Sequence, residues 1–136
     1  MTRLERFLNT FTLDGVVTSV MKKGNFSASV EYSYNHTPLG RCSYRVLPGC
    51  GPVIITHGSE IYPDFRGQGW GTKLHKARLA AFYDAEFRVA LCTVRQDNEP
   101  ERRILQRFGW VEGVKFFNPQ TRHDVSMWTK ELLGEE

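Results

Sequence analysis

Three glycines, Gly67, Gly69 and Gly71, stand where an apolar run gives way to a segment with helical periodicity. Glycine at a helix start weakens the helix by about 1 kcal/mol relative to alanine, so its presence there needs another reason. The usual reason is close approach of the backbone to a ligand. The first turn of a helix has N–H groups without internal partners, and the helix dipole adds about half a positive charge there. The spacing therefore predicts a phosphate-binding site.

Two common phosphate motifs do not fit this cluster. The P-loop needs a lysine directly after its last glycine and then Ser or Thr, whereas Lys73 follows Gly71 by two residues and precedes Leu74. The dinucleotide fingerprint is GxGxxG, whereas this cluster is GxGxG. That fingerprint also needs an acidic residue after the next strand, where this chain has Arg95. Another kind of phosphate site is therefore indicated.

The segment Arg66-Gly67-Gln68-Gly69-Trp70-Gly71 resembles the R/Q-x-x-G-x-G/A signature of the GNAT N-acetyltransferase superfamily. The preceding segment at 61–65, Ile-Tyr-Pro-Asp-Phe, is similar to the lead-in that often opens this motif. Further on, Asn98 and the Phe-Gly-Trp at 108–110 are similar to the residues that bracket the next helix of the family. The resemblance covers about residues 53–130, with two signatures in the right order and spacing.

The resemblance implies that acetyl-CoA is the cofactor, used as a co-substrate. Backbone N–H groups of residues 67–72 would hold its pyrophosphate, and its pantetheine arm would lie between strands at 53–62 and 88–94. Asn98 would hydrogen-bond that arm, and Arg102 or Arg103 would reach the 3′-phosphate. The expected cofactor-binding residues are Ile61, Tyr62, Arg66, Gly67, Gln68, Gly69, Trp70, Gly71, Thr72, Lys73, Asn98, Arg102 and Arg103.

Acyl transfer from a thioester to an amine needs a neutral amine, a hydrogen-bond donor to the oxyanion and a leaving thiolate. The resemblance places the oxyanion donor, a backbone N–H beside a strand bulge, at about Ile61 or Tyr62. It also places a tyrosine general acid four residues before the Gly-aromatic pair, but this chain has Leu105 there. Tyr62 and Tyr83 are other candidates for the acid, unless water replaces it.

Two residues are candidates for the general base. Glu60 lies on the strand that leads to the glycines, where several relatives carry a carboxylate that accepts the amine proton through water. His57 is the second candidate, and strand alternation puts it on the opposite face from Glu60 unless a bulge intervenes. The candidate catalytic residues are therefore Glu60, Tyr62 and His57.

Fewer features of the sequence indicate where the acceptor amine binds. In many relatives one or two helices after the first strand shape the acceptor pocket, and this chain has little room for them, because its strands begin by about residue 16. We expect an acceptor site that is either open or built from a loop at 34–51, with Tyr34, His36, Arg41 and Tyr44. An open site suits a protein or peptide amine better than a small molecule.

The resemblance therefore implies an acetyl-CoA-dependent N-acetyltransferase that acts on a primary amine by direct attack on the thioester. The alternative is a catalytically idle acyl-CoA-binding or partner-binding protein, which Leu105 and the short N-terminal region favour. Residues 66–107 hold nine Lys and Arg against five Asp and Glu, an excess too small to predict nucleic-acid binding. A homodimer is left open.

The spacing of apolar residues along the chain predicts the helices and strands that position these candidate site residues. Trp70, Leu74, Ala77 and Ala81 recur at helical spacing, which predicts a helix of about four turns. A buried strand is expected at 88–94, followed by a second helix that Asn98 caps and Gly109 stops. Strands are expected at 16–21, 26–34, 41–47 (a short one) and 53–62, a helical turn at 3–8, and two C-terminal strands around a turn at 118–122. With the resemblance, this order predicts an α/β fold of the GNAT type: a mixed, mostly antiparallel central sheet, flanking helices and a shortened N-terminal helical region.

The composition limits the class of protein. A length of 136 residues, with 40% hydrophobic and 24% charged residues, predicts one globular domain over 1–136. No stretch approaches the roughly 18 apolar residues that span a bilayer, and the N-terminus does not resemble a signal peptide, so we expect a cytoplasmic protein with no membrane partner. The three cysteines form no CxxC pair and no His lies at ligand spacing, so no metal site is expected.

Overall fold

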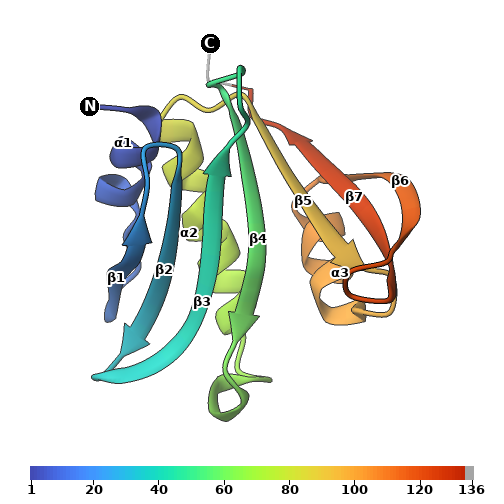
Figure 1. Cartoon of the computed structure of the whole chain (residues 1–136). Coiled ribbons are helices and arrows are strands. Elements are labelled where there is room, and N and C mark those ends of the chain that lie inside the picture. The colour runs from blue at the N-terminus through green and yellow to red at the C-terminus, as the bar shows by residue number, and fades with distance from the viewer. Residues whose placement is uncertain (134–136) are drawn as a thin grey trace.

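The structure, a computed structural model, describes residues 1–133 and builds three helices on one seven-stranded sheet (Figure 1). The helices are α1 (Arg3–Thr10), α2 (Trp70–Asp84) and α3 (Glu99–Arg107), with a single 3₁₀ turn at Pro63–Phe65. The strands are β1 (Val16–Lys23), β2 (Ser27–Tyr34), β3 (Thr37–Val46), β4 (Val53–Ile61), β5 (Val89–Arg95), β6 (Val111–Asn118) and β7 (His123–Glu131). No helix in the described part of the chain is long and apolar enough to cross a membrane.

The strands follow the order β1-β2-β3-β4-β5-β7-β6, and β4 and β5 form the one parallel pair of this sheet. A parallel pair needs a crossover, and α2 provides it between these two strands. The other neighbours are antiparallel, which confirms the expected mixed, mostly antiparallel sheet. The parallel junction therefore lies in the middle of the sheet, and the glycine cluster lies in its crossover, between β4 and the body of α2.

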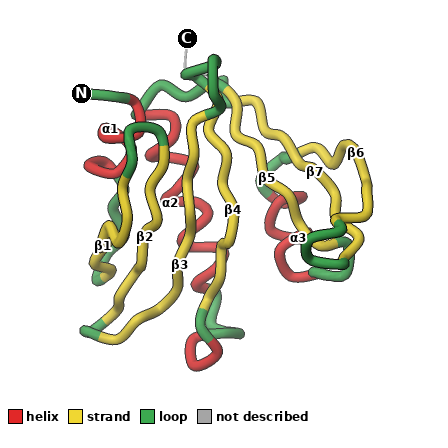
Figure 2. Tube along the Cα trace, in the orientation of Figure 1, coloured by secondary structure: helices red, strands yellow, loops and turns green. Residues whose placement is uncertain are grey.

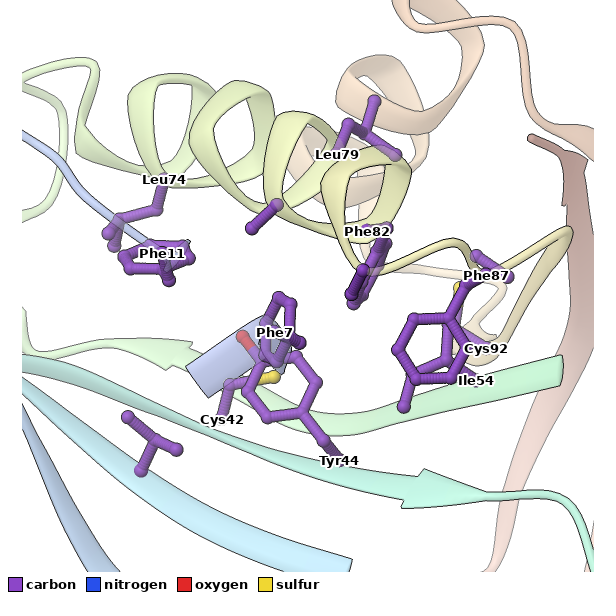
Figure 3. Close-up of a cluster of buried hydrophobic side chains, with 14 of the residues drawn as sticks. Phe7, Phe11, Cys42, Tyr44, Ile54, Leu74, Leu79, Phe82, Phe87 and Cys92 are labelled. Carbon is purple, nitrogen blue, oxygen red and sulfur yellow. The ribbon is translucent and has the colours of Figure 1, made fainter. Parts of the chain in front are cut away.

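The core lies between the sheet and the helices α1 and α2, which share one face of strands β1–β4 (Figures 1 and 2). Phe7 of α1 packs against Tyr44 of β3 and Phe82 of α2, with ring centroids 4.7 and 4.8 Å away (Figure 3). All three side chains are fully buried. The packing of these large aromatic residues fixes α2 against the sheet, and therefore fixes where the helix begins.

Most of the expected elements are confirmed. Helix α2 has the expected four turns, and α3 begins after Asn98, whose Oδ1 accepts from the Glu101 N–H at 3.3 Å. The helical turn expected at 3–8 is a helix of two turns, with the Thr2 hydroxyl as its cap. It precedes β1, and β1 runs into β2 through residues 24–26, with no helix between them.

Strand β3 is longer at its N-terminal end than predicted. It is a ten-residue strand and includes Pro38 and Gly40, which had suggested a loop. The register places an extra residue, Leu39, in β3 opposite the step from Tyr32 to Ser33, so the proline lies at a bulge. A Cβ on Gly40 would collide with the carbonyl oxygen of Glu60, so glycine lets β3 and β4 approach closely. The segment at 34–51 is therefore mostly a central strand rather than a loop.

Candidate functional site

The glycine cluster forms an open cradle, defined here as residues 67–72. Gly67 and Gly69 adopt φ angles of 75° and 83°, and a Cβ built on either meets nothing within 4 Å. The first backbone hydrogen bond of α2 runs from the Lys73 N–H to the Gly69 carbonyl. Within the described residues, the N–H groups of the cradle have no hydrogen-bond partner. These free donors at a helix N-terminus fit a diphosphate, as the sequence predicts.

Side chains beside the cradle hold it in place. The Arg66 Nε donates to the Ile61 carbonyl at 2.7 Å, and the Gln68 amide donates to the Asp64 carbonyl at 3.1 Å. The ring of Trp70 packs on Tyr34 at 4.8 Å between centroids, and the Lys73 ammonium lies 4.8 Å from the Trp70 ring centre. In this arrangement the Arg66 and Gln68 side chains stabilise the loop, and Lys73 places a positive charge next to it.

A bulge in β4 changes the expected position of the oxyanion donor. Ser43 pairs with His57 while Arg41 pairs with Glu60, so β4 carries one extra residue at Gly58–Ser59, where Gly58 has a φ of 64°. The expected donor was a backbone N–H at about Ile61 or Tyr62, beside such a bulge, and the Tyr62 N–H already donates to the Leu39 carbonyl at 2.9 Å.

The same bulge brings the two candidate bases to one face of the sheet. Ser43 and Arg41 are two residues apart in β3, so their partners His57 and Glu60 point the same way. Without the bulge, alternation would have put them on opposite faces. The two side chains nevertheless have different surroundings.

The strands β4 and β5 diverge beyond the Thr56–Cys92 pair and leave a slot of about 370 Å³ between them. Its lining comes from β4 and β5, from helices α2 and α3 and from the β6–β7 hairpin. His57 and His123 line it from the sheet face that carries Arg41 and Ser43, and His75, Arg78, Glu101 and Leu105 line it from the helices. The slot therefore passes through the sheet.

Glu60 lies outside this slot. Its carboxylate contacts the Arg41 guanidinium at 3.1 Å and the Arg66 guanidinium at 3.6 Å, and its side chain is 37% exposed. It lines a smaller pocket with Ile61 and Arg41 instead. Of the two candidate bases, the structure brings His57 to the slot.

The slot holds no tyrosine hydroxyl among its described lining residues. Leu105 does line it, and this side chain is 1% exposed. Tyr83 is not among the lining residues. The Tyr62 hydroxyl donates to Glu31 at 2.9 Å, and desolvation, followed by this bond, raises the pKa of Tyr62. Neither tyrosine lines the slot.

Of the residues predicted to contact the pantetheine arm and the 3′-phosphate of acetyl-CoA, Asn98 and Arg103 have free donor groups and Arg102 is held in ion pairs. Asn98 lines the slot, and only its Oδ1 is used as the cap of α3. The Arg102 guanidinium pairs with Glu99 at 3.2 Å and Glu112 at 3.4 Å, which ties it to the protein and makes it a poor phosphate ligand. Arg103 is exposed and has no ion pair within residues 1–133, so its guanidinium, unlike that of Arg102, is not already engaged.

The predicted acceptor residues do not form one site. Tyr44 is 0% exposed, and its hydroxyl accepts from Arg78 at 2.9 Å and bonds the Tyr32 hydroxyl, so its prediction as a substrate contact is wrong. Tyr34 packs on Trp70 next to the cradle. His36 lies in the two-residue turn of the β2–β3 hairpin, exposed, with a φ of 67°.

The sequence reasoning missed two residues of the slot, His75 and Arg78. Both are buried, at 2% and 5% exposure. The Arg78 guanidinium bonds Tyr44 and lies 3.4 Å from the Ser59 hydroxyl at the bulge. Their spacing did carry a signal, since positions 75 and 78 fall on the same helical face as Leu74 and Phe82.

Known proteins share the sequence pattern and the fold of this chain. The sequence model of the acetyltransferase (GNAT) family matches residues 12–110. No curated protein sequence matches the chain. The ribosomal-protein-S18-alanine N-acetyltransferase of Escherichia coli has a similar structure, with a TM-score of 0.73 at 11% identity over 89% of this chain and 96% of that one.

Two further solved structures share the fold. A putative acetyltransferase from Salmonella typhimurium, determined with its cofactor acetyl-CoA, has a TM-score of 0.65 at 15% identity, over 80% of this chain and 66% of that one. A putative phosphinothricin N-acetyltransferase has a TM-score of 0.69 at 17% identity, over 81% and 74%. These identities show the fold alone, whereas the family model covers most of the sequence. The chain belongs to the acetyltransferase (GNAT) family.

Proposed function

We propose that this protein is an acetyl-CoA-dependent N-acetyltransferase that moves an acetyl group to a primary amine, with a protein or peptide as acceptor. One observation carries the proposal: a cradle of free N–H groups stands at the helix that follows β4, and the β4–β5 slot beside it passes through the sheet. A donor held at the cradle and an amine arriving on the other face can meet in such a slot.

The residues present fit an acetyl-CoA molecule. The cradle donates to the pyrophosphate, Lys73 and Arg103 add positive charge, and Asn98 offers its free amide N–H inside the slot. Bound in this way, acetyl-CoA supplies an acetyl group activated as a thioester. The bulge at Gly58–Ser59 interrupts the β3–β4 ladder and frees backbone groups beside the slot, where an N–H can donate to a carbonyl oxygen.

His57 is the proposed proton acceptor. It lines the slot on the sheet face away from α2, the side from which an amine would enter. A neutral imidazole has one ring nitrogen with a free lone pair, which can take the proton that the amine loses on attack. Leu105 offers no acid, so the thiolate would leave without protonation by a side chain in that position. A thiolate is a good enough leaving group for this.

The choice of a protein or peptide acceptor rests on the open face. Within the described residues no helix lies between β1 and β2 to close the acceptor side, and β3 occupies most of the segment at 34–51. The neighbours do not decide between acceptors, since one is named for an alanine of a ribosomal protein and another for phosphinothricin. The second candidate function is an acyl-CoA-binding protein without transferase activity. Leu105 favours it, because this side chain lines the slot where a general acid would be expected.

Calorimetric titration of acetyl-CoA followed by thiol release separates these functions. We expect saturable binding, and thiol release with peptides that carry a free amine but not with the same peptides blocked at every amine. Polyamines and amino acids complete the acceptor panel. Binding without thiol release on any acceptor would favour the idle acyl-CoA-binding protein. Absence of binding to acetyl-CoA would refute both.

A further inference from the structure

His75 is a buried polar side chain to which the mechanism above assigns no role. It lies in α2, is 2% exposed and lines both the slot and the smaller pocket beside it. Its ring packs against Phe108 and Trp110, with centroids 4.9 and 5.7 Å away. A buried imidazole between two cavities has to satisfy two nitrogen atoms, and only one of them has a partner in the described part of the chain.

The partnered atom fixes the tautomer of the ring. The Trp110 indole N–H donates to His75 Nε2 at 3.0 Å, so Nε2 is an acceptor and the ring proton lies on Nδ1. Burial, with smaller contributions from the charges of Arg78 and Lys130, lowers the pKa of His75 to about 3. The ring is therefore neutral, and it presents Nδ1–H as a fixed donor.

Nδ1 is buried and has no hydrogen-bond partner among residues 1–133. A buried donor without an acceptor is destabilising and therefore rare in native proteins, so its presence points to an acceptor that a ligand supplies. The helix rise places His75 about 9 Å along α2 from Gly69, at the cradle. Arg78 lies one turn further, beside Ser59 at the bulge. His75 therefore lies at an intermediate level, between the places for a pyrophosphate and for a thioester.

We propose that His75 donates a hydrogen bond from Nδ1 to an amide carbonyl oxygen in the arm of the bound acyl-CoA, and so positions that arm in the slot. This inference rests on the proposed function. The arm is the part of acyl-CoA that must cross this level, and its amide carbonyls are neutral acceptors. A neutral donor held by Trp110 suits them, because it offers direction without adding a charge.

Two substitutions separate this role from a structural one. In His75→Gln the longer amide reaches the Nε2 position and keeps an acceptor for Trp110, but the Nδ1 donor is lost. In His75→Asn the shorter amide reaches the Nδ1 position and keeps a donor there, but the Trp110 N–H loses its acceptor. Each variant is titrated with acetyl-CoA and with 3′-phospho-ADP, which has the nucleotide and pyrophosphate but no arm, and each is melted thermally.

We expect His75→Gln to raise the Kd for acetyl-CoA about tenfold, with the Kd for 3′-phospho-ADP and the Tm near their wild-type values. His75→Asn should bind acetyl-CoA like the wild type and melt at a lower temperature. A His75→Gln variant that binds acetyl-CoA as tightly as the wild type, or that weakens both ligands equally, would overturn the inference. If the wild type binds neither ligand, the proposed function itself fails.

Discussion

The cradle and the slot lie next to each other but are built in different ways. The cradle consists of consecutive backbone N–H groups at 67–72, and its shape depends on left-handed φ angles at two glycines. The slot is lined by residues from six elements between β4 and β7, and its opening depends on where β4 and β5 stop pairing. A backbone site tolerates changes in its surroundings as long as its glycines remain. A side-chain site depends on every neighbour that places it.

The largest effect that this comparison predicts is at Gly69. Gly69→Asp puts a carboxylate at a left-handed position inside an anion site, so we expect the affinity for acetyl-CoA to fall about 100-fold or more. Gly49→Asp is the matched control: Gly49 has a φ of 77°, against 83° at Gly69, and a Cβ on either meets nothing within 4 Å. The backbone strain is therefore similar, and only the anion site differs. Equal calorimetric affinities of the two variants would contradict a backbone cradle.

The second prediction concerns the slot. His57→Ala should lower kcat about 100-fold at saturating acetyl-CoA, because a positioned base contributes at least that factor, with little change in the Kd for acetyl-CoA. Glu60→Gln should change kcat only a few-fold, since Glu60 lies outside the slot and between two arginines. Thiol release with a saturating peptide amine measures both. The reverse order of the two effects would return the role of base to Glu60.

The sequence predicted the backbone geometry around the glycines well because its determinants are local. The glycine spacing located the cradle, and the apolar period located α2. The Asn98 cap and Gly109 located α3, and both were confirmed. Each of these signals acts within a few residues, so a single sequence carries it.

The side-chain site was predicted less well because its determinants are non-local. The bulge position depends on the pairing of β4 with β3, which placed it at Gly58–Ser59. Tyr44 looked like a loop residue until Pro38 proved to lie at a strand bulge. Arg102 looked free until β6 brought Glu112 to it. None of these contacts has a signature within one short stretch of sequence.

The smallest predicted effect uses pH to compare the two regions. The cradle binds through backbone groups, which do not titrate, whereas the slot contains His75, whose pKa falls from 6.5 to about 3 on folding. Between these values the unfolded chain binds a proton that the folded chain does not. The neutral ring therefore contributes its full stability above about pH 6.5, and this contribution is lost as the pH falls toward 3.

The free energy of unfolding of the wild type should consequently fall, relative to that of His75→Gln, by about 1 kcal/mol per pH unit below pH 6. Urea unfolding of both proteins at about pH 7, 6 and 5 measures the difference, and groups other than His75 cancel in it. Parallel stability curves would mean that the folded protein protonates this ring as readily as the unfolded chain does. The part of the slot around His75 would then be open to water. In that case the slot, like the cradle, would be a solvated surface site.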